Sequence, residues 1–174
     1  MAEELIMGEL SGEKVVSSSV TAKDLYSQSL FGEMKNGNVA YSLVEAMYLL
    51  EKGKMKIKSN GKSMSFDSFL KKINKAEPTF WVRYCVFRDM RTRGYIVKTA
   101  LKYGAEFRVY DRGVKPGEDH AKWILFPVHE GSAFTWYDLS AKNRVSHSTK
   151  KKLLIGIVDE EDEVTYLEFQ WVRP

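Results

Sequence analysis

The first half of the chain alternates between strand-like and helix-like patterns of apolar and polar residues. The stretches ELIMGEL and EKVVSSS alternate weakly on either side of Ser11–Gly12, which predicts a β-hairpin within the first eighteen or so residues. Residues 54–59 (KMKIKS) alternate strictly and lead into Asn60–Gly61, a strong turn signal. The pattern therefore predicts a strand and a tight turn there.

Three helices are predicted around these strands. Thr21 is placed to cap a short helix, and Ser65 is placed to cap another. Between them, Ser42 and Glu45 have the spacing of a capping box for SLVEAMYLLEK, and Gly53 is the stop signal. The apolar stripes of the second and third helices, which we expect in the core, are Val44, Met47 and Leu50 with Tyr48, and Phe66, Phe69, Leu70 and Ile73.

A domain boundary is predicted where this pattern stops. Residues 71–77 are polar and end at Pro78, a residue that suits the first turn of a helix. We therefore expect an N-terminal domain at residues 1–77 and a second domain at residues 78–174.

The second domain has the pattern of a helix followed by strands and a further helix. A helix from Thr79 to Arg93 is closed by Gly94, and another is expected from Thr135 to about Lys142. The expected strands, the first two joined by a glycine turn at Gly104 and the last two by an acidic turn, are Tyr95–Thr99, Glu106–Tyr110, Trp123–Val128, Leu153–Val158 and Val164–Trp171. The fold class is therefore α/β (mixed α and β), with a small α+β N-terminal domain followed by a C-terminal domain built on a mixed sheet.

Composition restricts the class of protein. The 174 residues are 44% hydrophobic and 29% charged, which is ordinary for a globular protein. No apolar run approaches the roughly 18 residues that a membrane span requires, and the N-terminus is acidic rather than signal-like. The single cysteine, Cys85, excludes an intramolecular disulfide and a cysteine-based metal cluster. A cytoplasmic protein without a membrane partner is the simplest interpretation.

Charge is segregated along the chain. From Lys71 to Lys122 thirteen Lys and Arg residues stand against six Asp and Glu, and Lys142 to Lys152 adds five cations and no acid. Asp159–Glu163 is instead a run of five acids. Segregation of this kind is typical of a protein with an anionic partner, although solvated faces would give the same counts.

Tyr110, His120 and the lysines at 150–152 are the candidates for chemistry. Taken singly, each has an ordinary explanation: a strand-end tyrosine packs, a loop histidine is solvated, and a lysine cluster aids solubility. Strand alternation places Tyr110 on the same face as Arg108. None of the three histidines stands at the spacing from another that a metal site needs.

Together, the three residue types suit metal-free cleavage of RNA, in which the substrate's own 2′-hydroxyl is the nucleophile. The reaction needs a base for that hydroxyl, an acid for the departing 5′-oxygen and a cation for the charged transition state. Histidine gives a proton near neutral pH, and lysine acts as a point charge towards phosphate. Tyrosine is a weak base unless neighbouring cations, here Arg108 or Lys151, favour its ionised form.

Three stretches resemble the archaeal tRNA-splicing endonuclease (tRNA-intron endonuclease) family. They are FRDMRTRGYIVKTALKYGAEFRVYDRG at residues 87–113, His120, and RVSHSTKKKLLIGIVDEE at residues 144–161. The RGYxVKxxxKYGAxFxVY pattern is long and specific, and the chain length is similar to that of the short, homotetrameric type. The resemblance implies a nuclease-like catalytic C-terminal domain. That domain would cleave precursor tRNA at a bulge–helix–bulge, leaving 2′,3′-cyclic phosphate and 5′-hydroxyl ends without a metal or other cofactor.

The resemblance also implies a role for each candidate residue. By position, the family's general base falls on Tyr110, its general acid on His120, and its transition-state stabiliser on Lys151. Strand alternation puts Lys151 on the face of Leu153 and its two lysine neighbours on the other face, which separates the lysines without choosing between them.

Assembly is the last property that the resemblance implies. In the family an acidic loop of one subunit docks into a basic cleft of another, and that loop matches Asp159, Glu160, Glu161 and Asp162. The terminal strand TYLEFQWV is apolar enough to pair with its counterpart across a two-fold axis, and Arg144 matches an arginine that binds a bulge base. Two alternatives stay open: a metal-dependent nuclease of similar α/β build, and a non-catalytic RNA-binding subunit.

Overall fold

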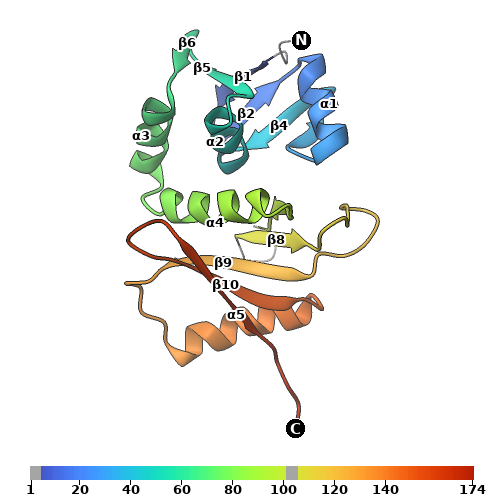
Figure 1. The fold of residues 1–174 in the computed structure, drawn as a ribbon, viewed down its shortest axis with the longest axis vertical. Coiled ribbons are helices and arrows are strands. Elements are labelled where there is room, and N and C mark those ends of the chain that lie inside the picture. The colour runs from blue at the N-terminus through green and yellow to red at the C-terminus, as the bar shows by residue number, and fades with distance from the viewer. Residues whose placement is uncertain (1–4, 101–105) are drawn as a thin grey trace. The chain divides into compact units, whose positions relative to one another are not determined.

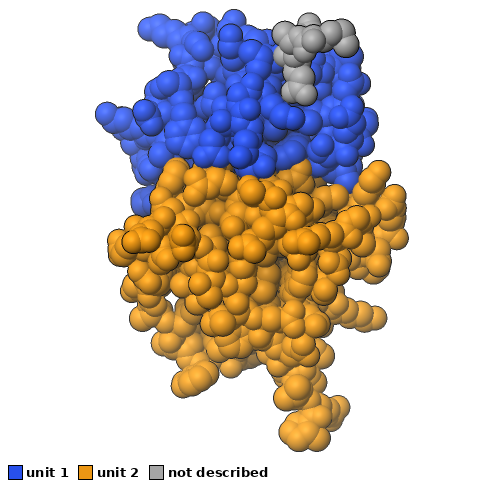
Figure 2. All heavy atoms as spheres, viewed as in Figure 1, with its two compact units in different colours: residues 1–80 blue, residues 81–174 orange. Residues whose placement is uncertain are grey.

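A computed structural model describes residues 5–100 and 106–174 of the chain. The chain forms two compact units, residues 1–80 and residues 81–174 (Figure 2). Each unit contains one sheet with its own helices (Figure 1). The glycine turn predicted at Gly104 lies outside the described residues.

The N-terminal unit is built on a six-stranded sheet. Its strands are β1 Ile6–Ser11, β2 Lys14–Ser17, β3 Glu33–Lys35, β4 Asn38–Ser42, β5 Met55–Ser59 and β6 Lys62–Met64, in the order β3-β4-β2-β1-β5-β6. The predicted hairpin across Ser11–Gly12 is confirmed, because β1 and β2 pair antiparallel. The turn at Asn60–Gly61 is confirmed as well: both residues have positive φ angles (52° and 75°), the conformation that a two-residue hairpin turn requires.

Three helices, α1 Val20–Ser29, α2 Leu43–Glu51 and α3 Phe66–Ala76, complete this unit. The capping box of α2 is confirmed, since a carboxylate oxygen of Glu45 accepts hydrogen bonds from both the N–H (2.9 Å) and the hydroxyl (2.8 Å) of Ser42. Val44 and Met47 of its predicted apolar stripe are buried as expected, whereas Leu50 is only partly buried and Leu49 is buried instead.

The start of α1 and the length of α3 differ from the pattern. Ser19, rather than Thr21, caps α1, because its hydroxyl accepts a hydrogen bond from the N–H of Ala22 (3.2 Å). Helix α3 continues through most of the polar residues 71–77, since Ile73 is buried and extends the apolar face begun by earlier residues of the helix.

The second unit is built on a five-stranded sheet. Its strands are β7 Ile96–Thr99, β8 Phe107–Tyr110, β9 Trp123–His129, β10 Lys152–Val158 and β11 Val164–Phe169, in the order β11-β10-β9-β8-β7. β9 and β10 run parallel, and the other neighbours pair antiparallel. All five predicted strands are present with shifts of a few residues at their ends, and the predicted mixed α/β class is confirmed.

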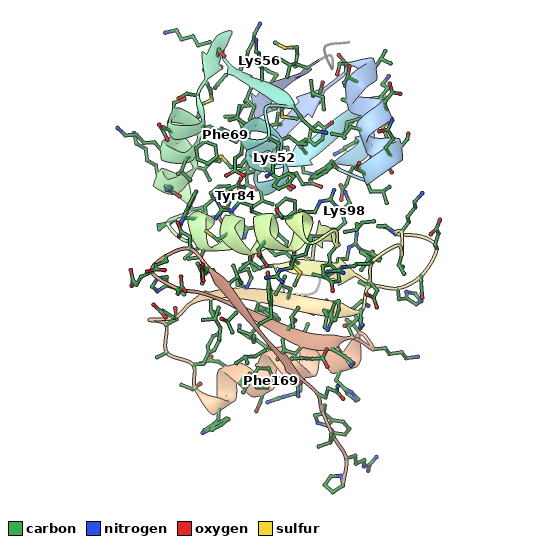
Figure 3. All side chains as sticks on the ribbon, in the orientation of Figure 1. Lys52, Lys56, Phe69, Tyr84, Lys98 and Phe169 are labelled. Carbon is green, nitrogen blue, oxygen red and sulfur yellow. The ribbon has the colours of Figure 1, made fainter. Side chains whose placement is uncertain are left out.

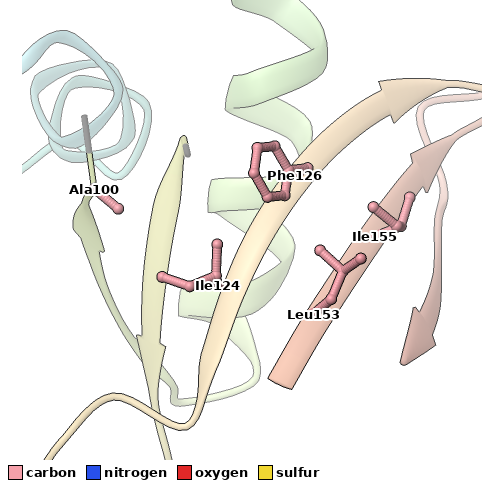
Figure 4. Close-up of a cluster of buried hydrophobic side chains, with 5 residues drawn as sticks. All are labelled: Ala100, Ile124, Phe126, Leu153 and Ile155. Carbon is pink, nitrogen blue, oxygen red and sulfur yellow. The ribbon is translucent and has the colours of Figure 1, made fainter. Parts of the chain in front are cut away.

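Two helices, α4 Phe80–Thr92 and α5 Trp136–Ser148, cover opposite faces of this sheet (Figure 1). The core on the α5 face is a cluster of Ala100, Ile124, Phe126, Leu153 and Ile155 (Figure 4). Leu139 of α5 packs against it, and so does Phe169 of β11, which is labelled in Figure 3. This core holds β8 and β10 in the sheet. The polar side chains of interest lie at the ends of these two strands.

Helix α5 is longer than predicted. Thr135 caps it as expected, with its hydroxyl accepting a hydrogen bond from the N–H of Asp138 (3.1 Å). The helix continues beyond Lys142 to Ser148, because Ser146 is completely buried and its hydroxyl donates to the Lys142 carbonyl (3.3 Å). The longer helix ends three residues before Lys151 and so controls where that lysine points.

Candidate active site

Side chains alternate between the two faces of β8. Phe107 is fully buried, and its ring lies 5.9 Å from that of Phe87 on α4. Arg108 and Tyr110 therefore face the α5 side of the sheet, where Arg108 stands opposite Ile124 of the core cluster. Tyr110 ends the strand and is 5% exposed, so its position is set by packing rather than by solvent.

The loop from β8 to β9 is anchored at both ends. One carboxylate oxygen of Asp111 accepts from the Arg112 N–H (3.0 Å), and the other accepts from Nζ of Lys122 (2.9 Å). The hydrogen bond from Lys122 is the main cause that holds the pKa of the Asp111 carboxyl below its usual value. The Lys122 N–H donates to the Val109 carbonyl (2.9 Å), which brings the end of the loop back beside β8.

Tight turns within this loop direct His120. The Glu118 N–H donates to the Lys115 carbonyl (3.0 Å), and Gly117 has a φ of 95°, a conformation that glycine adopts without strain. The His120 N–H donates to a carboxylate oxygen of Asp119 (2.7 Å). The histidine is thus held by local turns just before the start of β9.

The way the chain leaves α5 gives the lysines of the cluster different neighbours. Lys150 has a φ of 55°, which reverses the chain after the helix. Nζ of Lys151 donates to the Thr149 carbonyl (2.9 Å), whereas Nζ of Lys152 pairs with Glu168 of β11 (3.0 Å). Because consecutive residues face opposite sides of a sheet, the side chains of Lys151 and Lys152 lie on opposite faces.

Glu168 holds Lys152 on the α4 face of the sheet. Its carboxylate accepts hydrogen bonds from Nε1 of Trp123 (2.7 Å), the amide of Gln170 (2.9 Å) and Nζ of Lys152 (3.0 Å). These hydrogen bonds, that of Trp123 foremost, lower the pKa of Glu168 to about 2. The partner of Lys152 is therefore ionised at any physiological pH.

A cavity of about 290 Å³ opens on the α5 side where these segments meet. The three residues predicted for the chemistry, Tyr110, His120 and Lys151, all line it. The remaining lining residues are Arg108, Gly117, Glu118, Asp119 and Ala121. A phenol, an imidazole and two cations around one open volume are the groups that proton transfer at a phosphodiester requires.

Some lining residues had a sequence signal and others had none. Arg108 shares a strand face with Tyr110, so strand alternation alone is enough to predict that it lies beside the site. Glu118 and Asp119 line the cavity only because of the turns of the loop, which no periodic pattern predicts. Arg144, predicted to bind RNA, is exposed on α5 and is not one of the lining residues.

The acidic turn between β10 and β11 is ordered by two of its own carboxylates. Asp159 accepts hydrogen bonds from two N–H groups of the turn (both 2.9 Å), and Asp162 accepts one from Nε1 of Trp81 (2.7 Å). Glu160 and Glu161 at its tip are exposed. The predicted docking loop thus has structural acids at its base and exposed acids at its tip.

Comparison with known proteins identifies the family. Residues 80–166 match the tRNA intron endonuclease, catalytic C-terminal domain, and residues 6–70 match the tRNA intron endonuclease, N-terminal domain. The chain belongs to the tRNA intron endonuclease family. The resemblance seen in the sequence is confirmed, and the cavity lies within the part matched by the catalytic domain.

Curated relatives cover nearly the whole chain. A tRNA-splicing endonuclease of Thermococcus onnurineus is 40% identical over 98% of this chain and 99% of its own length. A second, of Methanothermobacter thermautotrophicus, is 39% identical over 97% of this chain and 99% of its own. A third, of Nanoarchaeum equitans, is 44% identical over 76% of this chain and 88% of its own.

Two further observations describe this family member. Within residues 5–100 and 106–174, no group of three or more His, Cys, Asp or Glu side chains is arranged to hold a metal ion. In the same part of the chain, every helix is too short or too polar to cross a membrane.

Proposed function

We propose that this endonuclease removes introns from precursor tRNA by cutting at bulge–helix–bulge sites. The observation that carries the proposal is that Tyr110, His120 and Lys151 line the same cavity, in the unit that matches the family's catalytic domain. Relatives named tRNA-splicing endonuclease, aligned over nearly the full chain, support the substrate. The domain assignment of residues 1–77 and 78–174 belongs to the same proposal.

The RNA supplies its own nucleophile in the proposed reaction. Tyr110, in its ionised form, accepts the proton of the 2′-hydroxyl while the bond from O2′ to phosphorus forms. The bond from phosphorus to the 5′-oxygen breaks, and His120 donates a proton to that oxygen. Lys151 stabilises the negative charge that accumulates on the non-bridging oxygens. The products are a 2′,3′-cyclic phosphate and a 5′-hydroxyl, and no cofactor enters the balance.

We propose that four copies of the chain assemble. β11 is an edge strand of its sheet, and Leu167 (46% exposed) and Trp171 (49% exposed) leave apolar surface there for a second copy. The exposed tip of the acidic turn, Glu160 and Glu161, supports docking against a basic surface of another subunit. In such an assembly, exposed Arg144 would contact a bulge base of an RNA bound across subunits.

A cytoplasmic location fits the same proposal. The single cysteine, Cys85, is buried in α4 and cannot form an intramolecular disulfide. Proteins of reducing compartments have cysteines of this kind.

The decisive experiment is cleavage of a bulge–helix–bulge RNA in EDTA with analysis of both new ends. We expect cyclic phosphate and 5′-hydroxyl ends with the wild-type protein. His120→Ala should slow cleavage on the order of 100-fold and leave the Kd for RNA within about threefold, because the acid acts only in the transition state. Cleavage that requires added magnesium would favour a metal-dependent nuclease, and RNA binding without cleavage would favour a non-catalytic subunit. Equal loss of binding and cleavage in H120A would contradict the acid role.

A further inference from the structure

We propose that Arg108 is a second phosphate-binding cation of the cavity, and that its guanidinium contacts the non-bridging oxygens of the scissile phosphate beside Lys151. The inference rests on the proposed function and adds a binding group to the same site. It is carried by the place of Arg108 in the strand, by an unsatisfied donor and by the charge of the cavity lining.

The geometry of β8 places Arg108 at a distance from Tyr110 that suits contact with the phosphate beside the 2′-oxygen. Residues two apart in a strand lie on the same face and are separated by roughly 7 Å along it. Both side chains line the cavity. Since the arginine side chain is long and Tyr110 would act at the 2′-oxygen, the guanidinium is within reach of the phosphate attached to the neighbouring 3′-oxygen.

The guanidinium has an unused donor. Nε of Arg108 is shielded from solvent and has no hydrogen-bond partner among the described residues. Buried donors in folded proteins are almost always paired, so an unpaired one at a cavity wall points to a ligand.

The balance of charge around the cavity depends on Arg108. Its two acids, Glu118 and Asp119, carry more charge than the ammonium of Lys151 alone. The guanidinium of Arg108 offsets the second acid, so without it these lining groups would carry a net negative charge that repels phosphate. The planar guanidinium can donate to two phosphate oxygens at once, whereas the lysine ammonium acts as a point charge.

The test compares Arg108→Met and Arg108→Lys with the wild type and with Arg112→Met. Arg112 is an exposed arginine four residues further on that does not line the cavity, so R112M removes the same charge nearby. At saturating RNA in EDTA, we expect R108M to lower the single-turnover rate on the order of 100-fold and to raise the Kd for RNA by no more than about tenfold. R108K should recover part of the loss, and R112M should stay within about threefold of wild type.

A second measurement does not depend on RNA cleavage. Calorimetric titration with inorganic phosphate should show about tenfold weaker binding to R108M and unchanged binding to R112M. Thermal unfolding checks that each variant is folded, and if R108M is not, the reduced rate and phosphate affinity of R108K decide. Wild-type rates or wild-type phosphate affinity in a folded R108M, or an equal loss in R112M, would overturn the inference. A wild-type protein that binds phosphate through Arg108 but does not cleave the RNA would contradict the proposed function instead.

Discussion

Lys151 and Lys152 are adjacent in sequence but have different neighbours. Lys151 lines the cavity, whereas Lys152 is paired with Glu168 on the opposite face of the sheet. We therefore predict that Lys151→Met lowers single-turnover cleavage on the order of 100-fold, because the transition state loses a cation. Lys152→Met should change the rate by less than about threefold, since Glu168 retains its hydrogen bonds from Trp123 and Gln170. Rates measured on one bulge–helix–bulge RNA in EDTA compare the two directly, and equal losses would contradict the assignment.

Single residues of the site were predictable to different degrees. Tyr110 and His120 were assigned by their place in a long motif, and strand alternation put Arg108 beside the tyrosine. Alternation could not choose among the lysines, because the choice depends on the turn at Lys150 and on Glu168, a residue of another strand. Long-range pairs of this kind leave no periodic signal.

Gly156 governs how closely α4 approaches β10. A Cβ at this position would lie 3.0 and 3.1 Å from the two methyl groups of Val86 and 3.3 Å from the ring of Tyr166. We predict that Gly156→Ala lowers the free energy of unfolding by about 1–3 kcal/mol through overpacking, as measured by urea denaturation.

The double variant V86A/G156A separates this contact from other effects. Val86→Ala removes the two methyl groups, so a Cβ added at position 156 no longer meets them. Adding G156A to V86A should therefore cost less than adding it to the wild type, and the difference is the coupling energy. An equal cost in both backgrounds would show that the contact with Val86 is not the cause.

The elements were predictable where local chemistry decides them. The capping box of Ser42 and Glu45 and the turn at Asn60–Gly61 depend on neighbours in sequence, and both are present in the structure. The end of α5 was missed because buried Ser146 is polar, and its burial arises from packing against the sheet. Tertiary packing thus extends a helix beyond the point where its sequence stops looking amphipathic.

The acidic residues of the turn between β10 and β11 bear on the assembly of the whole molecule. Asp159 and Asp162 hold the shape of the acidic turn, so reversing them would disturb the fold as well as any docking. Glu160 and Glu161 are exposed at the tip, and the contact of Glu160 with His129 is long (3.7 Å) and at the surface. Exposed ion pairs contribute little to stability. These two glutamates are therefore the residues to reverse.

We predict that E160K/E161K breaks the proposed tetramer into smaller species, because lysines at the tip would repel the basic surface on which it docks. Light scattering coupled to gel filtration gives the mass, and circular dichroism checks the fold. The matched control is E9K/E13K, which reverses two exposed acids in the N-terminal unit and should leave the assembly intact. If docking is electrostatic, raising the salt concentration should also shift the wild type towards smaller species. A tetrameric E160K/E161K, or equal dissociation of both variants, would refute docking through this turn.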